Sequence, residues 1–189
     1  MGADTDLQSR MARALDLLEI EQCLYRYASG IDRHDLDLAM SAYHSDALDD
    51  HGFFVGRAGD FVQRTPRAHE VFAAHQHYIV NHRIELSGEQ AHGEVYWMMV
   101  ARERTGDHVT ASGGRYIDRY ERRDGVWRIA ARVCIVEWTS REELVPVIFS
   151  AFQAARQDRS DLAYLRPLAV ERTFRDTMPE FQRSSEGAD

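Results

Sequence analysis

Two short stretches of this 189-residue chain bring together acidic and histidine side chains that could transfer protons. In the first, Asp32 and Asp35 follow the aromatic residue Tyr27. In the second, His75 and His77 are two residues apart, so they point to the same face if the segment is a strand. A pocket histidine that is oriented by a carboxylate can act as a general base near neutral pH. This is the chemistry that we expect from the two stretches.

Each of these side chains also has a simpler explanation. Asp35 directly precedes an apolar helical pattern and is predicted to cap that helix, and Asp32 could do the same. The His-x-His pair could bind a metal ion if Asp32 or His51 supplied a third ligand. We nevertheless predict no metal and no other cofactor. His51 ends a predicted strand, where it is either a further site residue or an exposed polar side chain.

The composition excludes several other kinds of chemistry. All 23 basic residues are arginine. Arginine stays protonated, so the chain has no amine for Schiff-base or pyridoxal phosphate chemistry and no P-loop lysine. The sequence contains no G-x-S-x-G elbow and no glycine-rich dinucleotide fingerprint. Cys23 and Cys134 lack ligand or redox spacing and are predicted to be buried thiols.

The charge distribution bears on the partners of the protein. There are 31 acidic residues, the net charge is -8, and the arginines are interspersed with acids. This pattern gives no basic surface for nucleic acid or for an anionic membrane. No apolar run is long enough to span a bilayer, and the N-terminus is too polar for a signal peptide. We therefore expect a cytoplasmic protein whose partner is a hydrophobic small molecule.

The elements that position these residues follow from hydrophobic periodicity. Helical spacing predicts helices over residues 7–29, 36–43 and 57–73, the last interrupted at Pro66. A short strand is predicted over 47–51. Turn signals then separate four β-rich segments, at 76–86, 92–104, 108–122 and 126–138. Helices followed by a strand meander indicate an α+β fold, and Gly113-Gly114 predicts a bend where the sheet curls.

The chain is predicted to consist of one α+β domain, residues 1–138, with an extension over residues 139–189. Ser140 is predicted to cap a helix. The apolar face of this helix comprises Leu144, Val145, Ile148, Phe149 and Phe152. Pro167 and Pro179 interrupt the polar tail that follows. We expect the extension to cover the sheet or a neighbouring subunit.

An ordered set of residues over about positions 10–138 resembles the SnoaL-like branch of the nuclear transport factor 2-like superfamily. The set is Tyr27-x4-Asp32-x2-Asp35, Ala42-Tyr-His-Ser-Asp-Ala47, Gln76-His77-Tyr-Ile-Val-Asn81 and Gly114-Arg-Tyr116-x-Asp-Arg-Tyr120-Glu-Arg-Arg-Asp-Gly125-Val-Trp127-Arg-Ile129. The resemblance implies a cone-shaped, cystatin-like α+β barrel. In that fold, one long and two shorter helices pack in a strongly curved, mostly antiparallel sheet.

The resemblance is greatest to three lyases: scytalone dehydratase, bile acid 7α-dehydratase and hexachlorocyclohexane dehydrochlorinase. These enzymes share an aspartate near the end of the first helix and a histidine at the start of the first long strand. Asp32 and His77 match these positions. The resemblance implies that the Asp orients a neutral His, which removes a proton from carbon. It further implies that Tyr27 and Arg132 assist the leaving group and that Tyr116 lines the pocket.

Two departures limit what the resemblance carries over. Scytalone dehydratase has a second catalytic histidine where this chain has Met98-Met-Val-Ala-Arg102, and an asparagine where Tyr116 stands. Its substrate is therefore not expected here. We predict that Tyr116, His51, Phe54 and Met98 contact the substrate, with Phe53, Tyr96 and Trp97 as further possible apolar lining. Which residues of the Tyr96–Met98 stretch face inward is left open, because neighbouring strand residues alternate.

The predicted function is that of a cofactor-independent lyase that eliminates water or formaldehyde from a hydrophobic aromatic or alicyclic molecule. Tyr27 stands where the dehydrochlorinase has a lysine, and a neutral phenol is better suited to an oxygen leaving group than to halide. Two alternatives are an isomerase or cyclase of the polyketide or steroid type and a non-enzymatic ligand-binding subunit. The resemblance also implies a homo-oligomer, with a trimer favoured over a dimer.

Overall fold

The computed structural model describes residues 2–145, 156–161 and 163–164 of the chain. The helices are α1 (Gly2–Asp32), α2 (Leu36–Met40) and α3 (Ala58–Ala68), and α3 is followed by the 3-10 turn η1 (His69–Val71). The strands are β1 (Tyr43–Asp50), β2 (Val55–Arg57), β3 (Phe72–Ser87), β4 (Gln90–Glu103), β5 (His108–Arg123) and β6 (Val126–Glu143).

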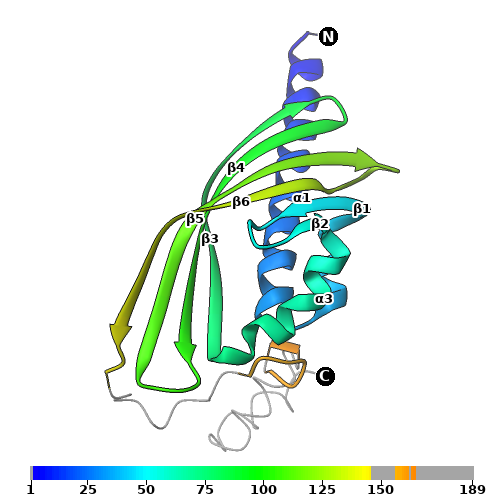
Figure 1. Cartoon of the computed structure of the whole chain (residues 1–189). Helices are drawn as coiled ribbons and strands as arrows, with labels where there is room; N and C mark the ends of the chain where they lie inside the picture. Colours follow the sequence, from blue (N-terminus) through cyan, green and yellow to red (C-terminus); the bar gives the residue numbers. More distant parts are fainter. Residues whose placement is uncertain (1, 146–155, 162, 165–189) are drawn as a thin grey trace, which may run out of the picture.

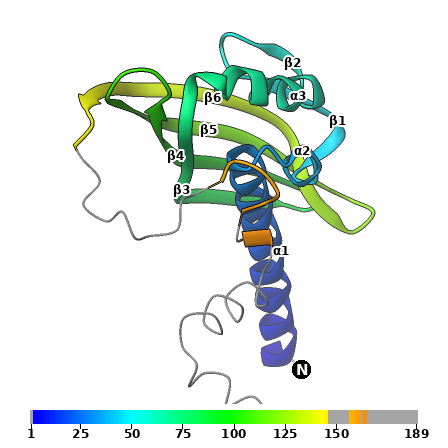
Figure 2. The same ribbon diagram turned by 90° about the horizontal axis from the view of Figure 1, so that it is seen from below.

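The strands form one six-stranded sheet in the order β2-β1-β6-β5-β4-β3. β1 pairs with β6 in parallel, and the other neighbours are antiparallel. The long strands curve strongly, and the C-terminal half of α1 lies with α2 and α3 on the concave side of the sheet (Figures 1 and 2). This arrangement is the cone-shaped α+β barrel that the sequence predicts.

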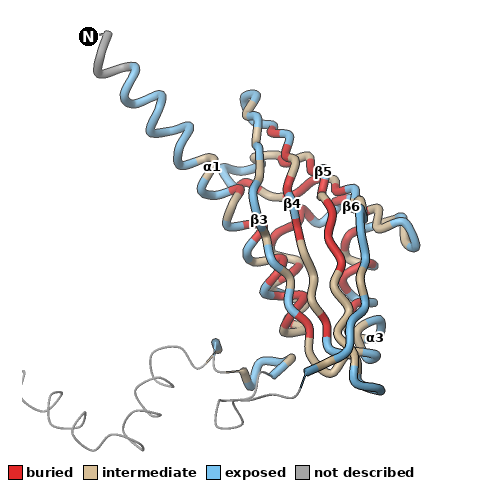
Figure 3. The backbone as a smooth tube through the Cα atoms, turned by 90° about the vertical axis from the view of Figure 1, so that its left-hand side faces the viewer, coloured by how far each residue is buried: buried red, intermediate tan, exposed pale blue. Residues whose placement is uncertain are grey.

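Helix α1 divides into an exposed half and a buried half (Figure 3). Its C-terminal half packs into the core through residues spaced three or four apart: Ile20, Cys23, Leu24, Tyr27 and Ile31. This spacing places one face of the helix against the sheet. The N-terminal half extends past the sheet. None of the helices in the described ranges is long and apolar enough to cross a membrane.

Close packing at the end of α1 depends on Gly30. A Cβ at this position would lie 2.4 Å from the backbone nitrogen of Ala39, so only glycine lets α2 approach α1 this closely. Asp35 caps α2 by accepting a hydrogen bond from the Leu38 N–H, as the sequence predicts. The bend at Gly113-Gly114 is also confirmed, because the register between β5 and β6 shifts there.

Several predicted boundaries differ from the structure. The short strand β2 lies in a segment expected to be a loop, and the third helix ends at Ala68, so that β3 begins at Phe72. Ser140 does not cap a helix, because β6 continues through it to Glu143 and pairs with β5. Leu144 and Val145 follow that strand. The rest of the predicted helix, with Ile148, Phe149 and Phe152, lies outside the described residues, as do Pro167 and Pro179.

Candidate active site

A cavity of about 290 Å³ lies between the concave face of the sheet and the helices. Its lining is mostly apolar and aromatic, and its polar residues are three histidines, two aliphatic hydroxyl side chains and two phenols. The lining residues are Tyr27, Ile31, His51, Phe53, Phe61, Thr65, Ala68, His69, His77, Trp97, Met99, Ser112, Tyr116, Cys134 and Val136. Such a lining suits a hydrophobic small molecule that a few polar groups orient.

At one wall of the cavity, Asp32 and His77 form a hydrogen-bonded pair. Asp32 is the last residue of α1, and His77 lies in β3. The ring Nδ1 of His77 is 2.6 Å from Asp32 Oδ1, and the backbone N–H of His77 donates to both carboxylate oxygens at 3.0 and 2.9 Å. Both side chains are largely buried. The sequence predicts the pair, and the structure brings its two members together.

This geometry defines how the imidazole is oriented. An ionised carboxylate only accepts hydrogen bonds, so the Nδ1 of His77 carries the proton that it donates to Asp32. In the neutral ring, Nε2 is then the unprotonated nitrogen, and His77 lines the cavity. A base held in one tautomer by a carboxylate, which also stabilises the imidazolium formed after proton uptake, is suited to general-base catalysis.

A second Asp–His pair lines the same cavity. His51, directly after β1, donates through Nδ1 to the carboxylate of Asp49, whose side chain is fully buried. Asp49 also accepts a hydrogen bond of 2.7 Å from Tyr43 Oη. The His51 ring stacks on Phe61 at 3.9 Å between ring centroids, and its Nε2 lies 3.5 Å from Tyr27 Oη. The ring is therefore held from both sides.

Tyr27 and Tyr116 form the inner part of the lining. Both phenols are 2 % exposed, and their rings meet edge to face at 5.9 Å. Tyr116 also stacks on Trp97 at 5.5 Å. Burial raises the pKa of both phenols above the usual value, so both stay protonated and can donate a hydrogen bond near pH 7. The structure thus places both predicted tyrosines in the cavity wall.

Arg132 does not line the cavity, contrary to the prediction that it assists the leaving group. It lies directly opposite Asp118 in the β5–β6 pairing, and two hydrogen bonds of 2.7 Å join the two fully buried side chains. Its guanidinium sits 3.9 Å from the ring centroid of Tyr116 and 4.5 Å from that of Tyr27. The cation therefore supports these tyrosines and does not face the substrate.

Two residues that were predicted to contact the substrate, Met98 and Phe54, do not line the cavity. Met98 lies on the opposite face of β4 from Trp97 and Met99, which line the cavity. Phe54 packs against Phe61 at 5.8 Å, and its neighbour Phe53 lines the cavity instead. Each residue is one position away from a residue that lines the cavity; for Met98 the reason is that consecutive residues of a strand point to opposite sides.

Some site residues were not predicted. Asp49 is two residues before His51, and this Asp-x-His spacing on a strand is a signal that could have identified the second pair. His69 lies in η1, a turn that the sequence pattern hides within a longer predicted helix. Ser112 and Cys134 enter the cavity through the curvature of β5 and β6. Burial raises the pKa of the Cys134 thiol to about 12.

The fold and the cavity together are those of the nuclear transport factor 2-like superfamily. Within that superfamily, residues 12–133 match the SnoaL-like domain family, and the chain belongs to this family. No curated protein matches the chain.

Solved structures with the same fold support this assignment. A hexachlorocyclohexane dehydrochlorinase (LinA, type 2) is 17% identical, with a TM-score of 0.68 over 76% of this chain and 99% of the other. A scytalone dehydratase-like protein of Novosphingobium aromaticivorans is 15% identical, with a TM-score of 0.62 over 75% of this chain and 97% of the other. A protein of unknown function with a cystatin-like fold, from Nostoc punctiforme, is 22% identical, with a TM-score of 0.55 over 66% and 92%.

Proposed function

We propose that the protein is a cofactor-independent lyase that removes a small oxygen-bearing group, water or formaldehyde, from an aromatic or alicyclic molecule. One observation carries the proposal: an Asp–His pair is fixed at the wall of an apolar cavity, with the unprotonated ring nitrogen as the available base. The dehydrochlorinase and the scytalone dehydratase-like protein of the same fold bear names of elimination enzymes, which agrees with this reaction type.

The reaction begins with proton removal by His77. Nε2 takes a proton from a carbon of the substrate beside the leaving group, and Asp32 stabilises the imidazolium that forms. For loss of formaldehyde, the same nitrogen takes the proton of a hydroxymethyl group, and the carbon–carbon bond breaks as the C=O bond forms. The electron pair of the broken bond stays on the remaining substrate carbon, which then takes up a proton. In both versions, the electron pair released by deprotonation drives the bond cleavage.

The leaving group needs a proton donor, and the geometry offers His51 and Tyr27. In this proposal, His51 delivers a proton from Nε2 to the departing oxygen while its Nδ1 stays hydrogen-bonded to the Asp49 carboxylate. Tyr27 Oη, 3.5 Å from that nitrogen, donates a hydrogen bond to the same oxygen. Water then leaves with one proton from His51, while His77 holds the proton taken from carbon.

The lining favours an oxygen leaving group over halide. Among the described residues that line the cavity there is no arginine, and the sequence has no lysine. The donors present are neutral phenols and a histidine, which suit a developing oxygen anion. The volume of about 290 Å³ fits a substrate with one or two rings, stacked against the aromatic wall of Phe61, Trp97 and Tyr116.

One observation favours a second candidate, an isomerase of the polyketide or steroid type. Two Asp–His pairs line one cavity, so a proton removed by His77 could be replaced at another carbon by His51. Such a reaction would move a double bond without loss of mass. In both candidates His77 is the base. They differ in where His51 delivers its proton: to the leaving oxygen in the lyase, and to another carbon in the isomerase.

A substrate panel in deuterated water tests both candidates. The panel contains aromatic and alicyclic alcohols with an acidic C–H beside the hydroxyl-bearing carbon, and products are identified by mass spectrometry. Loss of water or formaldehyde supports the lyase, and deuterium uptake without mass loss supports the isomerase. His77→Ala should abolish either reaction, while His92→Ala, an exposed histidine on β4, should not. Binding of panel members without any turnover would instead indicate a ligand-binding subunit.

A further inference from the structure

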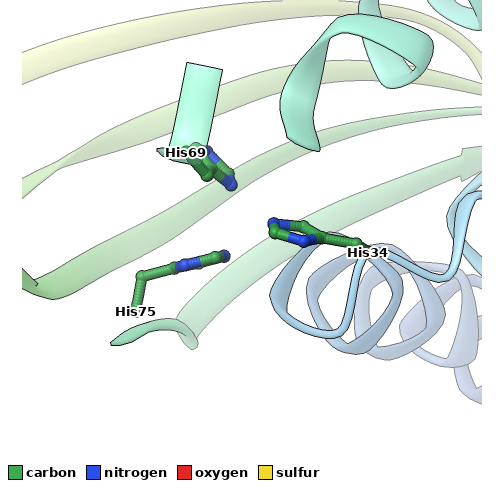
Figure 4. A group of neighbouring side chains, drawn as sticks. All are labelled: His34, His69 and His75. Atoms are coloured by element: carbon green, nitrogen blue, oxygen red, sulfur yellow. The ribbon is translucent and has the colours of Figure 1, made fainter. Parts of the chain in front are cut away.

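Three histidines from separate segments converge beside the Asp32–His77 pair. His34 lies in the turn between α1 and α2, His69 in η1, and His75 in β3. Each ring offers one nitrogen, and the three nitrogens all lie within 4.8 Å of one another; Figure 4 shows the three rings pointing toward a common point. The ring centroids of His69 and His75 are 4.3 Å apart, and those of His34 and His75 are 5.4 Å apart.

His34 has a backbone conformation that is unfavourable for residues other than glycine. Its φ of +50° is in the left-handed region, which favours glycine. The turn ends α1, because the His34 N–H donates to Ile31 O at 3.3 Å and the Asp35 N–H to Gly30 O at 2.9 Å. Helices commonly end on a left-handed residue of this kind, usually glycine. Histidine at this position therefore adds a side chain that the turn itself does not require.

The polar atoms of the cluster lack other partners. Within the described part of the chain, His34 Nε2 and His69 Nδ1 are buried and make no hydrogen bond. His75 is 2 % exposed, and its Nε2 makes two long contacts, of 3.4 Å with Ile31 O and of 3.9 Å with Asp32 Oδ1. Buried ring nitrogens normally find a partner, since leaving one unpaired costs about 1 to 3 kcal/mol. A shared ligand would satisfy all three rings.

We propose that His34, His69 and His75 bind a divalent transition-metal ion of the zinc class. Imidazole is a preferred ligand of zinc, copper, nickel and iron, and three histidines leave one coordination position open. With bonds of about 2.0 to 2.1 Å, tetrahedral ligand nitrogens lie about 3.4 Å apart. The ring nitrogens lie within 4.8 Å of one another, so each pair needs to close by at most about 1.4 Å to reach this spacing.

This site is distinct from the proposed base. His77 is engaged with Asp32, and it is not one of the three ligands. Asp32, His75 and His77 also lie within 4.8 Å of one another, but a cation there would have to break the 2.6 Å hydrogen bond that orients His77. A cation bound by His34, His69 and His75 would leave the hydrogen bond between His77 and Asp32 intact. Metal binding does not rest on the lyase function, so each can fail without the other.

The test measures metal binding directly on the full chain. Protein stripped with a chelator is titrated with Zn²⁺ by calorimetry, and bound zinc is counted by elemental analysis after gel filtration. Co²⁺ serves as a spectroscopic probe, because its visible absorption reports the geometry of the ligands. We expect one ion per chain. His34→Ala and His69→Ala should each weaken binding by at least about tenfold, while circular dichroism shows that both variants stay folded.

Two control variants separate this site from other histidines. His92→Ala, on the exposed side of β4, should bind zinc as the wild type does. His77→Ala should also retain binding, because His77 is not a ligand of the proposed site. Absence of stoichiometric zinc in the folded wild type would overturn the proposal. Loss of binding in His77→Ala with retention in His34→Ala would overturn it too, since the ligands would then be Asp32, His75 and His77.

Discussion

The carboxylate of Asp32 accepts hydrogen bonds from two groups of His77. The backbone N–H lies 2.9 Å from Asp32 Oδ2, and the ring Nδ1 lies 2.6 Å from Asp32 Oδ1. The last turn of α1 is thus joined to β3 at the residue that faces the cavity. Position and tautomer of the imidazole are set by the same carboxylate. The two residues should therefore act as one unit.

Asp32→Asn tests this unit. The neutral amide of asparagine lacks the negative charge that holds Nδ1–H and stabilises the imidazolium. We therefore expect turnover to fall by about 10² to 10⁴-fold, with the fold retained. The double variant Asp32→Asn/His77→Ala should lose little more than His77→Ala alone, because effects within a unit are not additive. Steady-state kinetics on a substrate identified from the panel checks this. Additive losses would show that Asp32 and His77 act separately.

The pair of Asp49 and His51 is expected to act on the leaving group. His51→Gln removes the proton donor, so it should slow the elimination of hydroxide far more than the elimination of a better leaving group such as acetate. Asp49→Asn should have the same selectivity. His77→Ala provides the contrast, since loss of the base should slow both substrates alike. Equal slowing of both substrates by His51→Gln would contradict the assignment.

The fold could be predicted from sequence because its signals are local and repeated. Four strands separated by turn residues, and apolar spacing along the first and third helices, are periodic over many residues. The Asp32–His77 pair was found through the resemblance, because sequence spacing alone left Asp32 as a possible helix cap. Neither residue type nor spacing shows that two segments 45 positions apart will meet.

The differences between the predicted and the observed cavity lining concern the direction of individual side chains. Met98 and Phe54 were each one position from the residue that lines the cavity. Arg132 was expected to assist the leaving group because it matches an arginine of the lyases that the sequence resembles. The structure gives it a partner, Asp118, directly opposite on the neighbouring strand. Cross-strand register determines that pairing, and register depends on the bulges that the sequence locates only roughly.

The Arg132–Asp118 pair is predicted to affect stability more than catalysis. Arg132→Met leaves the Asp118 carboxylate buried without its partner, so the free energy of unfolding should fall by about 3 to 5 kcal/mol. The double variant Arg132→Met/Asp118→Leu should recover part of that loss, because no uncompensated charge remains. Urea denaturation followed by tryptophan fluorescence measures both. Arg83→Met, at an exposed ion pair with Glu85, is the control and should change stability little.

The Cys134 thiol should be unreactive although it lines the cavity. Burial raises its pKa to about 12. The thiolate is the reactive form, and at pH 8 it would make up about one part in 10⁴, against about a quarter for a free thiol of pKa near 8.5. Alkylation should therefore be slow from pH 6 to 9 and rise with pH, and it should become fast in urea. Mass spectrometry of the peptide that contains Cys134 checks this. Rapid labelling of the native protein at pH 8 would contradict the prediction.

The exposed half of α1 is predicted to mediate self-association. Leu7, Met11, Leu15 and Leu18 form one stripe at helical spacing, and each is 52 to 60 % exposed. A continuous apolar stripe of this kind typically marks an interface, and the resemblance implies a homotrimer rather than a dimer.

Light scattering should give a mass of about three chains of 21.8 kDa. Leu15→Glu should reduce that mass toward one chain, while Arg13→Glu, on the opposite side of the helix, should not. A monomeric wild type, or a Leu15→Glu variant that keeps the full mass, would show that the stripe does not join copies of this chain.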